Sequence, residues 1–85
     1  MNSKVTGFPQ YRKLSNNKVY YRILDERHFD EIQIIGKSAR LFNIEAKQYP
    51  EILRIYDLLE QSLEGIEFST EAEFHQIGTN YGMEL

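Results

Sequence analysis

The sequence predicts an α+β domain with two layers, in which an antiparallel meander of about four strands packs on one main α-helix and a short helix follows near the C-terminus. Three observations predict this class. Polar and apolar side chains alternate within residues 11–46, apolar side chains recur with a helical period within residues 50–63, and turn-forming residues separate these segments. The 85-residue chain has the length of one domain, so we expect residues 1–85 to form a single unit with mobile ends at 1–7 and 79–85.

The first two strands are predicted on either side of a turn at residues 15–18, Ser-Asn-Asn-Lys. Asparagine tolerates the left-handed backbone that a tight hairpin turn needs. With residues 16 and 17 as the loop, Arg12 lies opposite Tyr21, and alternation then assigns the side chains to two faces. The expected core face carries Leu14, Val19, Tyr21 and Ile23, and the outward face carries Lys13, Tyr20 and Arg22, which Tyr11 can join.

The third and fourth strands are predicted at residues 29–35 and 39–46, on either side of Gly36. A two-residue loop would place Ile32 opposite Leu41, whereas a three-residue loop at Gly36–Ser38 would place Ile32 opposite Phe42. We favour the three-residue loop, which groups apolar side chains on one inward face. The side chains expected on that face are Ile32, Ile34, Phe42, Ile44 and Ala46.

The main helix is predicted at residues 51–63. Pro50 suits the first helical turn, where its missing N–H costs nothing, and Glu51 suits the positive end of the helix dipole. Apolar side chains at helical spacing form one wide face. That face consists of Ile52, Ile55, Tyr56, Leu59 and Leu63, widened by Leu53 and Leu58. Gly65 is expected to end the helix.

A short extended segment at residues 66–68 and a second helix follow the main helix. Thr70 can cap the N-terminus of the second helix while Glu73, three residues later, reaches back as in a capping box. The glycines that follow Gln76 predict that regular structure is lost soon after this residue.

Composition and charge exclude several classes of protein. The chain has no cysteine, which excludes disulfides, a thiolate nucleophile and cysteine-based zinc or iron–sulfur sites. No apolar stretch approaches the roughly 20 residues that span a bilayer, so we expect a cytoplasmic protein without membrane contact. The net charge of −3 conceals a gradient, because residues 1–24 carry five bases and no acid while residues 55–85 carry seven acids and no base. These charges either neutralise each other within the fold or between subunits, or form separate binding surfaces.

Neither histidine is predicted to form a catalytic or metal site. Glu71 and His75 are four residues apart on the second helix, but two ligands do not make a zinc site. His28 is close in sequence to Asp30 and Glu31, yet alternation places these two carboxylates on opposite faces. The Gly-Lys-Ser tripeptide after the third strand lacks the upstream glycine of a phosphate-binding loop. We therefore predict no catalytic residue, no cofactor and no metal.

The outward face of the first hairpin is the expected contact surface. It combines aromatic rings with cations through Tyr11, Lys13, Tyr20 and Arg22, and tyrosine is enriched at protein interfaces. A sheet covered on one side leaves its other face or an edge open. We predict a non-catalytic protein-interaction or accessory module that binds a protein partner or a second copy of itself. The alternative is weak single-stranded nucleic-acid binding on the same face, although the sequence pI near 5.3 is low for that function.

Overall fold

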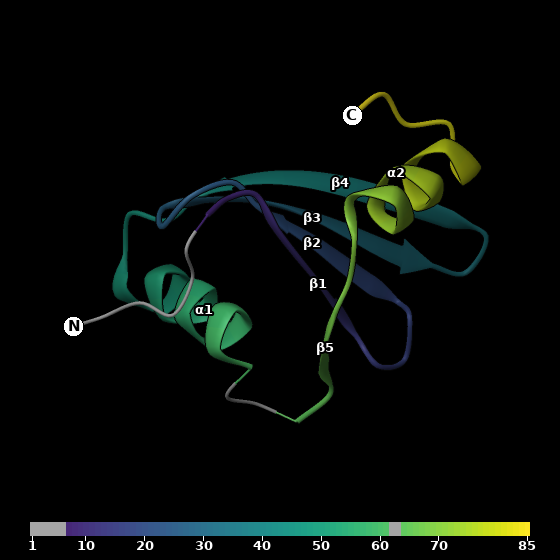
Figure 1. The fold of residues 1–85 in the computed structure, drawn as a ribbon. Helices are drawn as coiled ribbons and strands as arrows, with labels where there is room; N and C mark the ends of the chain where they lie inside the picture. The colour runs from purple at the N-terminus through teal and green to yellow at the C-terminus, as the bar shows by residue number, and fades with distance from the viewer. Residues whose placement is uncertain (1–6, 62–63) are drawn as a thin grey trace.

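A five-stranded antiparallel sheet forms the centre of the protein, and the predicted α+β class is confirmed (Figure 1). The computed structural model describes residues 7–61 and 64–85. The strand order is β4-β3-β2-β1-β5, so the first four strands form the predicted meander and β5 adds to its β1 side. The elements in chain order are β1 (Gln10–Leu14), β2 (Val19–Ile23), β3 (His28–Ile35), β4 (Ser38–Glu45), α1 (Tyr49–Glu60), β5 (Ile66–Phe68) and α2 (Glu71–Asn80).

The two helices lie on opposite faces of the sheet (Figure 1). The cluster of buried residues beneath α1 consists of Tyr21, Ile23, Phe29, Ala46, Ile55 and Leu58. The cluster beneath α2 consists of Tyr11, Tyr20, Ile32 and Phe74. The short helix therefore adds a partial third layer to the predicted arrangement, and both faces of the sheet contribute to a core.

The register of β1 and β2 is the predicted one. Arg12 lies opposite Tyr21, and Lys13 lies opposite Tyr20. Asn17 in the connecting turn adopts a φ of 59°, the left-handed conformation that asparagine tolerates. The predicted core face of this hairpin packs toward α1 through Leu14, Val19, Tyr21 and Ile23.

The register of β3 and β4 differs from the one that the sequence favoured. Ile32 lies opposite Leu41, and the loop consists of Gly36 and Lys37 alone. Gly36 adopts a φ of 61°, which suits the first position of a two-residue hairpin loop. The three-residue loop was wrong because the apolar side chains of these strands do not share one face. Ile32 and Leu41 pack toward α2, whereas Ile44 packs toward α1.

The main helix begins at Tyr49, close to the predicted start, and ends earlier than predicted. Pro50 occupies its first turn. The helix ends at Glu60, and the residue that caps it is Gln61, in a left-handed conformation with a φ of 51°, rather than Gly65, which lies further along the chain. Leu63, which the prediction placed in this helix, lies outside the described residues.

The C-terminal segment forms β5, which pairs with β1, and then α2. The Thr70 hydroxyl accepts a hydrogen bond from the backbone N–H of Glu73 at 3.1 Å, which confirms the predicted N-cap. The helix continues beyond Gln76, where the sequence predicted that regular structure ends. The backbone N–H of Met83 then donates to the carbonyl of Gly78 at 2.8 Å, and the Met83 side chain packs against the cluster beneath α2.

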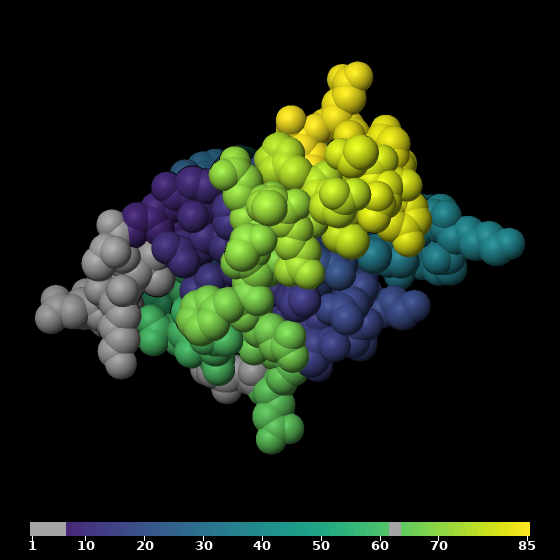
Figure 2. Space-filling view, turned by 45° about the vertical axis from the view of Figure 1, so that its right-hand side comes forward, coloured from purple at the N-terminus to yellow at the C-terminus, as the bar shows by residue number. Residues whose placement is uncertain are grey.

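The space-filling view shows how the C-terminal segment, in yellow, is stacked on one side of the molecule (Figure 2). The teal tip of the β3–β4 hairpin projects beyond it. Within residues 7–61 and 64–85, neither helix has the length and apolar character needed to cross a membrane.

Candidate functional site

The predicted contact surface lies beneath α2. Tyr11 is 9% exposed and Tyr20 is 4% exposed, because Phe74 of α2 packs against this face. The ring centroids of Tyr11 and Phe74 are 5.8 Å apart in a tilted arrangement that is favourable for aromatic pairs. The expectation that these tyrosines face solvent is therefore wrong, because the second helix covers a face that the sequence analysis left open.

The two cations of the predicted surface are bound within the fold. Lys13 Nζ lies 3.0 Å from Glu73 Oε2, and this hydrogen bond raises the pKa of Lys13. Arg22 Nη2 lies 2.8 Å from Oδ2 of the buried Asp30. The Arg22 guanidinium also lies over the ring of Phe74, 4.9 Å from its centroid. The structure thus brings the four predicted residues together, but they form the surface against which α2 packs.

This placement bears on the nucleic-acid alternative. Base stacking requires exposed aromatic rings beside cations that are free to approach phosphates. Burial raises the pKa of both Tyr11 and Tyr20, and the neighbouring Lys13 and Arg22 are paired with carboxylates. The protein's own helix therefore occupies the surface on which that alternative depended.

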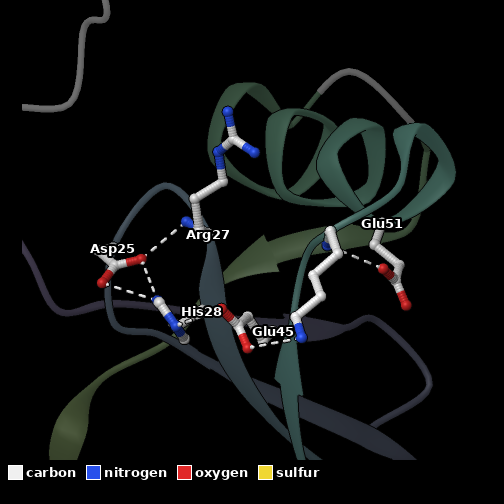
Figure 3. Close-up of polar contacts among 6 residues, drawn as sticks. Asp25, Arg27, His28, Glu45 and Glu51 are labelled. Carbon is white, nitrogen blue, oxygen red and sulfur yellow. Dashed lines mark hydrogen bonds and ion pairs between the residues drawn. The ribbon is translucent and has the colours of Figure 1, made fainter.

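His28 lies between two carboxylates at the start of β3 (Figure 3). Its Nδ1 atom is 2.9 Å from Asp25 Oδ1, and its Nε2 atom is 3.7 Å from Glu45 Oε2. The Asp25 carboxylate also accepts a hydrogen bond from the backbone N–H of Arg27 at 2.7 Å. This backbone hydrogen bond, followed by the one from His28, lowers the pKa of Asp25. The cluster ties the turn before β3 to the end of β4.

The two carboxylates that the sequence analysis considered beside His28 point to opposite faces of the sheet, as predicted. Asp30 faces α2 and accepts a hydrogen bond from Arg22 Nε at 2.9 Å. Glu31 faces α1, and its Oε1 atom lies 3.9 Å from Arg54 Nη1. Both side chains are almost completely buried, so their partners serve mainly to compensate for lost hydration.

A shallow depression of about 150 Å³ adjoins His28. Its polar lining includes Asp30 and Asn43, and Asn43 Nδ2 donates to Asp30 Oδ1 at 2.6 Å. Glu45, at its rim, lies 3.6 Å from Lys47 Nζ as well as near His28. Each ionisable side chain that lines this depression therefore has a partner in the described part of the chain. The arrangement holds the turn before β3 against the end of β4.

The second histidine is arranged as the sequence predicted. His75 Nε2 lies 4.0 Å from Glu71 Oε2 on the exposed side of α2. Among residues 7–61 and 64–85, no three histidine or carboxylate side chains are grouped so that they could hold a metal ion.

β4 forms one edge of the sheet, and no strand in the described ranges pairs with its outer side. The backbone N–H of Ala46 donates to the carbonyl of Arg27 at 2.6 Å, so even-numbered residues of β4 direct their backbone groups toward β3. The N–H and C=O groups of residues 39, 41, 43 and 45 consequently point away from the sheet. β4 has eight residues, whereas β5 at the opposite edge has three. A long free edge of this kind is a template for pairing with another strand.

Exposed apolar side chains lie on this edge and on α1. Phe42 of β4 is 38% exposed, and Ile35 beside the hairpin loop is 57% exposed. Tyr49, Leu53 and Tyr56 are exposed at i, i+4 and i+7 spacing, which places them in one stripe along α1. Tyr56 and Leu53 were predicted on the buried face of this helix, and both predictions are wrong. The buried face is centred on Ile55 and Leu58.

The strand that forms β4 was predictable from the sequence, but its role as a contact surface was not predicted. The apolar pair Leu41-Phe42 between the polar Arg40 and Asn43 was the available signal, but its meaning depends on strand order. No family model matches the chain, and no curated protein or solved structure matches it significantly. The geometry of the described residues therefore carries the functional interpretation.

Proposed function

We propose that this domain is a non-catalytic protein-interaction module that self-associates through the free edge of β4. The observation that carries the proposal is an eight-residue edge strand whose alternate backbone groups point outward beside the partly exposed Phe42 ring. Pairing with a strand of a second copy would replace hydration of these groups with strand hydrogen bonds and would bury part of the ring.

The arrangement of the helices supports an edge rather than a face as the contact. A sheet with one open face can dimerise by packing two such faces together, but α1 and α2 cover both faces here (Figure 1). The remaining strand surfaces are the two edges. The three residues of β5 provide a much shorter template than the eight of β4.

The charged groups near His28 support a non-catalytic role. The imidazole and its two carboxylates join a turn, β4 and the residues before α1 through contacts within the chain (Figure 3). Such pairs maintain the shape of the edge strand, because Glu45 is the last residue of β4.

Sedimentation equilibrium at increasing protein concentration tests the proposal. We expect the mass of the wild-type protein to rise from the 10.1 kDa of one chain toward twice that value. The Phe42→Lys variant is expected to remain at the mass of one chain, because an exposed lysine on an edge strand opposes strand pairing.

Tyr56→Lys is the matched control, since it makes the same change of an exposed aromatic side chain to lysine on α1, away from β4. We expect this variant to associate like the wild type. A wild-type protein that stays at the mass of one chain up to millimolar concentration overturns the proposal. Loss of association in Tyr56→Lys together with unchanged association in Phe42→Lys would move the contact from β4 to α1.

A further inference from the structure

We propose that two copies of this chain pair antiparallel through β4 about a two-fold axis at Leu41, so that Lys37 lies beside the partner's Glu45. This inference rests on the proposed self-association and adds the register of the contact. Of the charged side chains near the edge, Lys37 and Arg40 have no ion-pair partner among the described residues, which leaves both available to a second copy.

Symmetry limits the registers that are possible. Residues directly opposite each other in an antiparallel pair lie on the same face of the sheet, so an odd-numbered residue of β4 must lie opposite an odd-numbered one. The middle of Ser38–Glu45 falls between Leu41 and Phe42. A two-fold axis at either residue therefore gives nearly complete overlap of the two strands.

Hydrogen bonding by itself gives a small advantage to the axis at Phe42. That register places the outward backbone groups of residues 39, 41, 43 and 45 opposite one another, whereas the axis at Leu41 does so for residues 39, 41 and 43 and places residue 45 opposite Lys37 of the loop. The axis at Leu41 therefore depends on the side chains at the two ends of the paired strands.

Charge favours the axis at Leu41. In that register Lys37 lies opposite the partner's Glu45, and the two-fold axis repeats this pair of opposite charges at the other end. An axis at Phe42 instead places Lys37 opposite the partner's Lys47, and the repulsion is also repeated. An axis one residue earlier, at Arg40, places two guanidinium groups opposite each other.

Arg40, the second cation without an ion-pair partner among the described residues, also favours the axis at Leu41. With the axis at Leu41, Arg40 lies opposite the partner's Phe42 on the face that carries α1. A guanidinium beside an aromatic ring is attractive, and the same pairing covers the exposed fraction of the ring. With the axis at Phe42, Arg40 lies opposite the partner's Ile44, which offers neither charge nor ring.

Disulfide formation between single-cysteine variants measures the register directly, because the chain contains no cysteine of its own. At the proposed axis the two Leu41 Cα atoms would be about 5.5 Å apart, which is within the range that a disulfide bridges. We expect Leu41→Cys to form a covalent dimer under mild oxidation. In the same register, residue 42 of one copy is offset by two positions from residue 42 of the other copy, so their Cα atoms are more than about 7 Å apart. Phe42→Cys should therefore form the disulfide at least about tenfold more slowly.

A charge exchange provides a test that keeps the packing of Leu41 intact. Lys37→Glu and Glu45→Lys should each raise the dissociation constant by about ten- to thirtyfold, because each replaces two attractive pairs with two repulsive ones. The double variant should recover most of the wild-type affinity. Lys18→Glu, at an exposed position in the β1–β2 turn, makes the same charge change away from the edge and should leave the dissociation constant within about twofold.

The outcomes separate the register from the self-association itself. A dimeric wild type in which Phe42→Cys reacts faster than Leu41→Cys, or in which the double charge variant fails to recover, overturns the axis at Leu41 while the proposed function stands. A wild type that remains monomeric overturns both. If Leu41→Cys does not fold, as judged by circular dichroism, the charge exchange alone decides the register.

Discussion

Arg12 Nε donates a hydrogen bond to the carbonyl oxygen of Leu58 at 2.9 Å, which joins β1 to the last turn of α1. Arg12 Nη2 also donates to the carbonyl of Leu59 at 3.3 Å. Carbonyls in the last turn of a helix lack partners within that helix, and a positive charge suits the negative end of the helix dipole. The ring of Phe68 covers the guanidinium 4.5 Å from its centroid, and burial lowers the pKa of Arg12. This side chain is a buried cap for α1 that comes from a distant strand.

Replacing Arg12 with methionine is expected to lower the free energy of unfolding by about 2–4 kcal/mol, because the change leaves buried helix carbonyls without donors. Urea denaturation followed by circular dichroism measures the change. Lys18→Met removes an exposed lysine and should alter stability by less than about 0.5 kcal/mol. A loss below about 1 kcal/mol for Arg12→Met would show that water or another donor satisfies these carbonyls.

The sequence predicts the strands of this fold better than it predicts which face of the sheet is buried. Alternation correctly placed Tyr20 and Tyr21 on opposite faces. It could not show that both faces are covered, because α2 buries its side of the sheet mainly through one large side chain, Phe74. The same limitation explains the error in the β3–β4 register, where apolar residues belong to two cores.

The candidate edge depends on pairing between distant parts of the chain. β5 lies beside β1, where Glu67 is opposite Lys13, and so leaves β4 free. If the same three residues paired with β4, the edge near Phe42 would be covered. No local pattern in residues 38–45 distinguishes these two arrangements, so the strand was predictable and its role was not.

Phe74→Ala is expected to lower the free energy of unfolding by about 3–4 kcal/mol, because the ring is 1% exposed and fills the space between α2 and the sheet. Hydrogen exchange should also accelerate in α2 more than in α1, since Phe74 is the fully buried anchor of the C-terminal helix. His75→Ala changes the neighbouring exposed position and serves as the control. Equal acceleration of exchange in both helices would instead indicate that they unfold together.

Acid is expected to weaken the attachment of α2. The Ser69 hydroxyl, and then Lys13, hold the pKa of Glu73 below its ordinary value of 4.5 by hydrogen bonding to the carboxylate. Because the folded-state pKa is lowered, this contribution to stability is present above about pH 4.5 and is lost as the pH falls through the lower, folded-state pKa.

Glu73→Gln tests this pH dependence. The wild type should be more stable than the variant at pH 7, by up to about 1 kcal/mol for a partly exposed pair, and the difference should shrink below pH 4.5. Urea denaturation across pH 2.5 to 7 gives the comparison, with Glu26→Gln in an exposed turn as a control for net charge. A difference that stays constant with pH would assign the role of Glu73 to packing rather than to its charge.

Gly36→Ala is expected to lower the free energy of unfolding by about 1–2 kcal/mol, because Gly36 has a φ of 61° and residues with a Cβ atom disfavour this conformation. Space is not the reason, since a Cβ atom at this position would meet nothing within 4 Å. Gly7→Ala is the matched control, because Gly7 is equally open and lacks a positive φ. Thermal unfolding of the two variants separates backbone strain from the general effect of removing a glycine. If Gly36→Ala were as stable as Gly7→Ala, the two-residue loop would be untenable, and the register that places Ile32 opposite Leu41 would have to change with it.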